Sequence, residues 1–286
     1  MPLKTSTTSS KAVDSKPESK EKPFYLSVSR VNLFEQCPAK YRYKYIEKLP
    51  DRSSYQSATG TFLHKALELF VLEYIKSKDL RASAQKAFIL AKNDPEIQEL
   101  KDLITPEMTS EVKNWIKEYV VLLEKYPEKM PSFLQAETKF SFQIEKTSFV
   151  VNGFIDRIDQ LSDNTIRVVD YKTTTNPAYL DPFQLVVYTI PTQRMFPGKT
   201  VIGSYELARH KFDEKRYEIT DTDREAAIDK IVSVGTQIEK LIEADDPHKW
   251  KPRPSYLCNY CPFRVQCAKD HSSSWTPTRA TPCQNS

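Results

Sequence analysis

A pair of apolar, β-branched segments with charged residues among them constrains this chain more than any other stretch. Residues 149–174 read FVVNGFIDRIDQLSDNTIRVVDYKTT, and the Ser-Asp-Asn sequence at 162–164 favours a tight turn. The pattern predicts a β-hairpin. Because the side chains of a strand alternate between its two faces, Asp170 and Lys172 should share one face and Tyr171 should occupy the other.

The predicted hairpin also brings Asp156, on its first strand, beside Asp170 on the second. Two carboxylates and the Lys172 ammonium would then lie where a strand of this composition should present apolar side chains. Neighbouring carboxylates repel unless a cation lies between them, and oxygen ligands favour Mg²⁺ or Mn²⁺. The pattern therefore indicates metal-assisted phosphodiester hydrolysis, with Lys172 orienting water or stabilising negative charge. A surface hairpin with ordinary solvated charges is the alternative.

Further motifs occur in a fixed order around the hairpin. Along the chain they are G-x-x-x-H at 60–64, an acid at Glu137, G-x-x-D-R at 153–157, D-x-K at 170–172 and Q-x-x-x-Y at 184–188. In this order they resemble the RecB-like branch of the PD-(D/E)XK nuclease superfamily, over residues 25–270. One small departure is Ile155, which stands where the superfamily name has a proline before the first aspartate.

The resemblance assigns a role to each motif. It implies that four groups hold the metal: His64, Asp156, Asp170 and the carbonyl of Tyr171. It implies that Lys172 positions the attacking water, that Gln184 and Tyr188 shape the site, and that Glu137 supports the metal or binds a second ion. Without the resemblance, His64 on an apolar helix would be interpreted as a core histidine. Gln184 and Tyr188, one turn apart, would be half-buried polar residues.

A second cluster of candidate ligands lies near the C-terminus. Cys258, Cys261 and Cys267 form a C-x₂-C-x₅-C pattern, which indicates a metal. Because structural sites usually have four ligands, Cys37 is the available fourth. Zinc and an iron–sulfur cluster both fit this spacing. RecB-like nucleases with one distant N-terminal cysteine and a C-terminal triplet typically hold a [4Fe–4S] cluster, so the resemblance favours that occupant. Four ordinary buried cysteines are the alternative, and Cys283 has no spacing partner.

Length and composition limit the remaining possibilities. With 286 residues and 39% hydrophobic content, the chain can form one large domain, expected at 24–270 between a disordered tail at 1–23 and a flexible tail at 271–286. No apolar run reaches the length of a membrane span, and no apolar leader is present, so we expect a cytoplasmic protein with reduced cysteines. A net charge of +4 is compatible with a nucleic-acid partner but does not require one.

The predicted fold is α/β, a restriction-endonuclease-like core with a central mixed sheet flanked by helices. Patterns of period 2 and 3.6 predict further strands at 133–145, 200–207 and 215–219, and helices at 60–76, 182–196 and, capped by Asp221 or Thr222, to residue 243. Helices interrupted near Pro95 and Pro106 should cover one side of the site. The aromatic and basic stretch at 37–45 either contacts DNA or packs its tyrosines on the core.

The function expected from the resemblance is a Mg²⁺- or Mn²⁺-dependent deoxyribonuclease, in the first instance an exonuclease acting on single-stranded ends. The chain has no P-loop motif, so a helicase motor would have to come from a partner. Two other functions remain open. One is a nuclease of CRISPR spacer acquisition, which would have an integrase partner. The other is a nucleic-acid-binding module that has the fold but no turnover.

Overall fold

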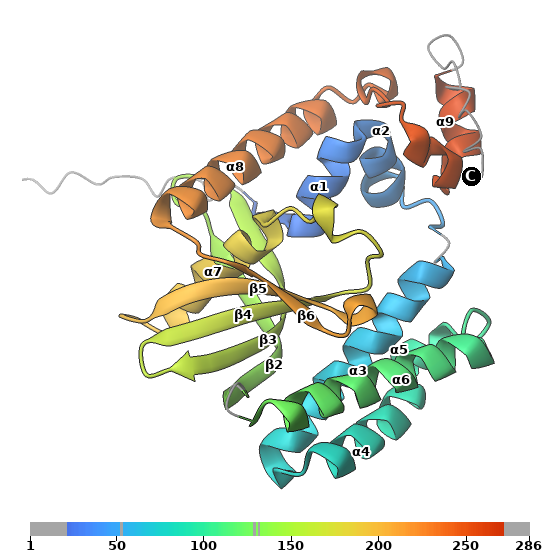
Figure 1. Ribbon diagram of the computed structural model, residues 1–286. Helices are drawn as coiled ribbons and strands as arrows, with labels where there is room; N and C mark the ends of the chain where they lie inside the picture. The colour runs from blue at the N-terminus through green and yellow to red at the C-terminus, as the bar shows by residue number, and fades with distance from the viewer. Residues whose placement is uncertain (1–21, 52–53, 128–129, 131, 272–286) are drawn as a thin grey trace, which may run out of the picture.

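The computed structural model describes residues 22–51, 54–127, 130 and 132–271. A six-stranded mixed sheet forms its centre and is covered by helices on both faces (Figure 1). This is the predicted α/β architecture of a mixed sheet flanked by helices. The expected tails at 1–23 and 271–286 lie almost entirely outside the described residues, as does Cys283.

The sheet is built around the predicted hairpin. Its strands are β1 (Phe24–Leu26), β2 (Ser132–Gln143), β3 (Phe149–Ser162), β4 (Thr165–Lys172), β5 (Thr200–Leu207) and β6 (Asp213–Tyr217). Their order is β1-β3-β4-β5-β6, and β2 also pairs with β3. The β1–β3 and β4–β5 pairs are parallel, whereas the others are antiparallel. Strands β4 and β5 are almost continuously buried, as expected for central strands covered on both faces.

Three helices cover one face of the sheet: α1 (Val28–Gln36), α7 (Phe183–Met195) and α8 (Asp221–Glu243). Helix α7 lies between the sheet and α8, so nearly all of its circumference is buried. This position explains why its sequence is apolar on every side instead of amphipathic. The same burial fixes the rotation of α7 and thereby the direction of the polar side chains near its N-terminus.

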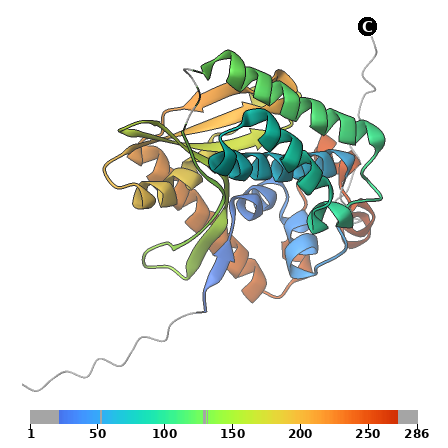
Figure 2. The same cartoon turned by 90° about the horizontal axis from the view of Figure 1, so that it is seen from below.

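The other face carries a helical cap formed by α3 (Tyr55–Ser77), α4 (Leu80–Lys92), α5 (Pro95–Glu99) and α6 (Pro106–Lys125). Viewed from below, α4 and α6 lie side by side across this face (Figure 2). Pro95 and Pro106 each occupy the first helical turn, where the missing N–H is not needed, so the predicted interruptions begin helices. The predicted cap is therefore confirmed.

The two ends of the described chain pack against each other. The short elements here are α2 (Pro38–Tyr41), the π-helix η1 (Arg42–Ile46), the 3₁₀ turns η5 (Pro247–Lys249) and η6 (Tyr256–Tyr260), and α9 (Arg264–Asp270). The Trp250 ring stacks on Tyr41 with centroids 6.0 Å apart, and the Tyr43 hydroxyl donates to Asp270 at 2.9 Å. Both tyrosines are buried, so the stretch at 37–45 places these rings in the core and not on a DNA-binding surface.

Several element boundaries differ from the sequence predictions. Helix α3 begins at Tyr55, five residues before the predicted start at Gly60, because Ser54 provides the N-cap. Helix α8 is capped by Thr220 and not by Asp221 or Thr222, since Thr220 and Asp223 form a reciprocal capping box. Strand β6 pairs with β5 from Asp213 onward. Among the described helices, none is both long and apolar enough to cross a membrane.

Candidate active site

The hairpin brings Asp156 and Asp170 together at one end of the sheet. Arg157 pairs with Val169 across β3 and β4, so the next positions along the two strands carry the two aspartates. The Tyr171 backbone N–H donates to Asp156 Oδ2 at 2.9 Å, which fixes this carboxylate against the partner strand. Asp170 is 1% exposed. The predicted juxtaposition of two carboxylates is therefore present, and both are largely withdrawn from water.

His64 reaches the same place from helix α3. Its Nε2 lies 2.9 Å from the Tyr171 carbonyl oxygen, and its Nδ1 lies 3.2 Å from Asp156 Oδ2. Burial favours the neutral ring, but the Asp156 and Asp170 carboxylates outweigh it and raise the pKa of His64 to about 9. The protonated ring then donates to both oxygens. His64 thus lies against Asp156 and the Tyr171 carbonyl, and its role as a metal ligand stays a prediction of the resemblance.

Lys172, Gln184 and Tyr188 form one hydrogen-bonded chain with Asp170. The Lys172 ammonium lies 2.6 Å from Asp170 Oδ2 and donates to Gln184 Oε1 at 2.8 Å. The Gln184 amide nitrogen donates to Asp170 Oδ1 at 2.6 Å and to the Tyr188 hydroxyl at 2.7 Å. Asp170 Oδ2 is buried and accepts no hydrogen bond of ordinary geometry in the described structure, although Lys172 is close. The buried Asp170 Oδ2 is therefore paired with the Lys172 ammonium but receives no well-aligned hydrogen bond.

The two aspartates differ in their affinity for protons. Burial raises the pKa of Asp170 to about 6; the Lys172 ammonium opposes this shift and the Asp156 carboxylate adds to it. Burial also acts on Asp156, but the His64 ring and the Tyr171 N–H hold the pKa of that carboxyl below its usual value. Asp156 is therefore stabilised as an anion, whereas Asp170 binds a proton at a higher pH than an ordinary aspartate does.

Glu137 lies on β2 and faces the same site. Its backbone adopts a left-handed φ of 47°, which is uncommon for a residue other than glycine. Burial and the Asp156 and Glu68 carboxylates raise the pKa of Glu137 to about 7. These three acids line a pocket of about 300 Å³ together with His64. The sequence analysis missed Glu68, although its position one turn after His64 on an apolar helix places both on one face.

On the opposite face of the hairpin, a buried ionic network holds Tyr171. Arg157 is 0% exposed, and it donates to the hydroxyl groups of Tyr119 and Tyr171 at 2.5 Å and to both oxygens of Asp159. It also donates to Glu206 from both terminal nitrogens. This network anchors the side chain whose backbone carbonyl contacts the His64 ring. Sequence analysis did not identify the network, because two of its members, Tyr119 and Glu206, come from α6 and β5.

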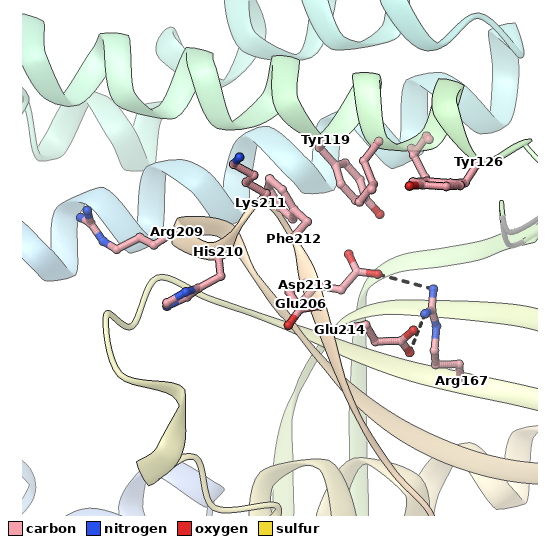
Figure 3. A pocket seen from close by; sticks show the side chains of 12 residues that line it. Tyr119, Tyr126, Arg167, Glu206, Arg209, His210, Lys211, Phe212, Asp213 and Glu214 are labelled. Carbon is pink, nitrogen blue, oxygen red and sulfur yellow. Dashed lines mark hydrogen bonds and ion pairs between the residues drawn. The ribbon is translucent and has the colours of Figure 1, made fainter.

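Another cavity, of about 730 Å³, is lined by Tyr119 and Glu206 of this network (Figure 3) and by neither of the two aspartates. It lies between the C-terminal part of α6, which contributes Tyr119 and is followed by Tyr126, and the β5–β6 connection. Arg167 pairs with Glu214 at 2.8 Å and lies 3.5 Å from Glu206. The Glu206 and Glu214 carboxylates at this cavity are therefore already paired with an arginine.

The four predicted cysteine ligands meet although Cys37 lies far from the others in sequence. Cys37, Cys258, Cys261 and Cys267 line one small cavity of about 30 Å³. All four are free thiols. Burial and the neighbouring cysteines raise the pKa of Cys267 to about 11. Lys40 and Arg253 line the same cavity and place positive charge beside the sulfur atoms.

Within the described ranges, no group of three or more His, Cys, Asp and Glu side chains is arranged, as it stands, to hold a metal ion. At the candidate active site, the carboxylates are already in contact with side-chain cations. Asp156 is paired with His64, and Asp170 is paired with Lys172, so cations of the protein itself lie against both carboxylates.

A mixed sheet flanked by helices, with two buried carboxylates and a lysine at the end of a central hairpin, defines an α/β protein of the nuclease type. The family model for the PD-(D/E)XK nuclease superfamily matches residues 25–268. The chain belongs to this superfamily.

The chain is also similar to several longer proteins. It is 30% identical over 207 residues to an ATP-dependent helicase/deoxyribonuclease subunit of Clostridium perfringens (strain SM101), a match that covers 57% of this chain and 17% of that protein. The subunit of the same name from Streptococcus agalactiae serotype Ia is 27% identical over 178 residues, covering 58% and 16%. The chain thus matches about a sixth of the length of these relatives. A solved structure described as a candidate exonuclease from Eubacterium rectale aligns with a TM-score of 0.46 and 14% identity, covering 83% of this chain and 86% of that one.

Proposed function

We propose that the chain is a Mg²⁺- or Mn²⁺-dependent deoxyribonuclease that acts as an exonuclease on single-stranded ends during DNA repair or processing. The observation that carries the proposal is the juxtaposition of Asp156 with the buried Asp170 and the Lys172 ammonium. Membership of a nuclease superfamily and similarity to proteins named as deoxyribonuclease subunits support the reaction and the substrate class.

The chemistry of the donor set suits a divalent cation. Four groups would hold it: His64, Asp156, Asp170 and the Tyr171 carbonyl. Three of these offer oxygen, which Mg²⁺ and Mn²⁺ prefer, and an imidazole is a good ligand for Mn²⁺. Asp170 Oδ2 is buried and accepts no hydrogen bond of ordinary geometry in the described structure, so it could bind the metal instead. The bound metal would supply charge stabilisation at the phosphate and activation of water.

The protein's own side chains have distinct tasks in this proposal. His64 would release one ring proton to the solvent, so that the neutral ring could serve as a ligand. The Lys172 ammonium leaves Asp170 Oδ2 and turns toward the attacking water or the phosphate oxygen. Gln184 accepts from that ammonium through Oε1 and donates to Asp170 Oδ1, so it maintains their spacing. The Tyr188 hydroxyl accepts a second hydrogen bond from the Gln184 amide nitrogen.

The cysteine cluster is a second cofactor site in this proposal. Cys37, Cys258, Cys261 and Cys267 would hold a [4Fe–4S] cluster, with zinc as the other occupant that their spacing allows. Their convergence on one cavity supports a shared ligand. Such a cluster carries thiolate charge, which Lys40 and Arg253 would offset. It would join the two ends of the fold and would not take part in hydrolysis.

A partner that supplies a helicase motor is part of the same proposal. The relatives are named as subunits of an ATP-dependent helicase/deoxyribonuclease, and the 286 residues of this chain contain no P-loop motif. We propose that such a motor would deliver unwound strands to the site.

The test of the nuclease proposal is degradation of end-labelled single-stranded DNA with Mn²⁺ by the native chain and by Lys172→Ala. Lys92→Ala, at the exposed end of α4, is the matched control. We expect metal-dependent cleavage by the native chain and the control, and a loss of at least about a hundredfold in Lys172→Ala. Equal cleavage by Lys172→Ala would remove the lysine from the reaction. Metal binding without cleavage of any DNA by the native chain would favour a binding module.

A further inference from the structure

The loop between β4 and α7 connects the two halves of the candidate active site, since Lys172 precedes it and Gln184 follows it (Figure 1). Near its middle, Tyr179 is 86% exposed. The ring extends from the loop that joins Lys172 to Gln184, so its faces are available to a ligand that is bound at the candidate site.

The backbone of this loop is held firmly although Tyr179 projects into solvent. Arg209 Nε donates to the Thr173 carbonyl at 3.0 Å, and the Tyr205 hydroxyl donates to the Asp181 carbonyl at 2.7 Å. Additional hydrogen bonds link the Lys215 ammonium to the Pro177 carbonyl at 3.3 Å and the Asn176 side chain to the Ala178 N–H at 3.0 Å. The exposed ring thus extends from an ordered support, which reduces the entropy lost when a ligand binds.

Positive charge lies along the first half of the loop. Lys172 is its first neighbour, Arg209 contacts its beginning and Lys215 contacts its middle. Cations attract a phosphate backbone, and an aromatic ring stacks on an unpaired base irrespective of sequence. A ring and cations together on one fixed loop match a single nucleic-acid strand better than a protein or a small metabolite.

We propose that Tyr179 stacks on an unpaired base of the strand whose phosphodiester lies at Lys172, and that this contact selects single-stranded or frayed ends. The inference rests on the proposed nuclease function and names how that site recognises its substrate. Within a duplex both faces of each base are covered by neighbouring pairs, so the ring finds a free face only where the strands are separated.

The first test measures binding of a fluorescein-labelled single-stranded oligonucleotide with Ca²⁺ in place of Mn²⁺. We expect Tyr179→Ala to raise the Kd roughly five- to hundredfold, and Tyr179→Trp to restore it. Binding of a blunt duplex should change much less. Tyr25→Ala removes a half-exposed tyrosine on β1 and should leave both Kd values unchanged. Equal losses on single-stranded and duplex DNA, or no loss with either, would overturn the stacking role.

The second test removes bases instead of the ring. An abasic residue is moved one position at a time along the oligonucleotide. At one position the native chain should lose as much affinity as Tyr179→Ala loses on the intact strand, and the variant should lose nothing further there. If the abasic residue has no effect at any position, or if its effect and that of the variant add fully, the ring does not contact that base.

A third measurement separates this inference from the proposed function. Bis(p-nitrophenyl) phosphate is a phosphodiester without a base, so Tyr179→Ala should hydrolyse it within about twofold of the native rate, whereas Lys172→Ala should lose activity. If the native chain hydrolyses neither this ester nor DNA, the nuclease proposal fails and the inference fails with it. If the native chain cleaves DNA and Tyr179→Ala binds and cleaves normally, the inference alone is wrong. Unchanged thermal unfolding of Tyr179→Ala shows that folding is intact.

Discussion

At the scale of single residues, Gln184 is the side chain that ties the lysine to the buried carboxylate. Gln184→Met keeps the length of the side chain but removes all three of its hydrogen bonds, to Lys172, to Asp170 Oδ1 and to the Tyr188 hydroxyl. We expect kcat on end-labelled DNA to fall about a hundredfold with little change in KM, because the lysine is misplaced in the transition state. Asp170 loses a buried donor, so the free energy of unfolding should also fall by about 1–3 kcal/mol.

The comparison with Tyr188→Phe makes this prediction specific. That variant removes only the hydrogen bond from the Gln184 amide nitrogen to the Tyr188 hydroxyl, so it should reduce kcat less than Gln184→Met does. An increase in KM without a fall in kcat for Gln184→Met would show instead that the amide binds the substrate and does not position the lysine.

We expect the Glu214 carboxylate to make the free energy of unfolding depend on pH under acidic conditions. Burial opposes its ionisation, but Arg216, Arg167 and the Ser204 hydroxyl outweigh burial and lower the pKa of Glu214 to about 2. A pKa lowered in the folded state stabilises the fold above the unfolded pKa, near 4.5, and this stabilisation is lost as the pH falls from 4.5 toward 2. Urea unfolding of Glu214→Gln should therefore depend less on pH in that window. Glu218→Gln, an exposed carboxylate near the end of β6, is the control and should show the native dependence.

Single residues differ in how far they can be predicted from sequence. The positions of Asp170 and Lys172 follow from strand alternation, which is a local rule, and the structure has both on one side of β4. Arg157 follows Asp156 directly, yet its partners Tyr119 and Glu206 come from other elements. No local rule pairs residues so far apart, so the network that anchors Tyr171 could not be derived.

At the scale of elements, the β3–β4 hairpin was predictable because its turn and its alternation lie in one continuous stretch. Helix α3 was predicted to begin at Gly60, since its apolar pattern starts there, whereas the structure begins it at Tyr55 with Ser54 as the cap. The five residues between the cap and Gly60 are Tyr-Gln-Ser-Ala-Thr, a stretch too short to show a helical period although Ala58 and Thr59 are buried. A hydrophobic pattern thus locates the middle of a helix more precisely than its first turn.

The contact between α8 and β3 depends on a glycine. A Cβ added at Gly235 would lie 2.8 Å from the Phe149 ring, closer than carbon atoms approach. Alanine is favoured over glycine in a helix by about 1 kcal/mol, but overpacking a core costs about 1–3 kcal/mol. We therefore expect Gly235→Ala to lower the free energy of unfolding, measured in urea. Ser233→Ala on the exposed side of the same helix should leave it unchanged or raise it slightly. A stabilised Gly235→Ala would mean that Phe149 moves without penalty.

At the scale of the whole molecule, the chain closes on itself where its two described ends meet. The sequence predicted that Cys37 would join Cys258, Cys261 and Cys267, and all four do line one cavity. The packing that surrounds them was not predicted, because the stacking of Trp250 on Tyr41 joins residues that no local pattern relates. Aromatic packing thus holds the ends together, and a metal at the cysteines would add a covalent constraint to a contact that already exists.

If the four cysteines bind a metal, the cross-link should stabilise the packing of the two ends of the fold. Closing a loop as long as that from Cys37 to Cys258 with a cross-link is worth about 5 kcal/mol in the chain-entropy model. We expect Cys37→Ser and Cys258→Ser to lose the metal and the visible absorption of an iron–sulfur cluster alike, and to unfold at similarly reduced urea concentrations. Cys283→Ser, outside the described residues, should keep both properties.

Metal analysis decides the occupant, since one zinc per colourless native chain would exclude the iron–sulfur cluster. If the native chain holds neither metal, or if Cys37→Ser keeps its metal while Cys258→Ser loses it, then Cys37 is not a ligand and aromatic packing alone closes the fold.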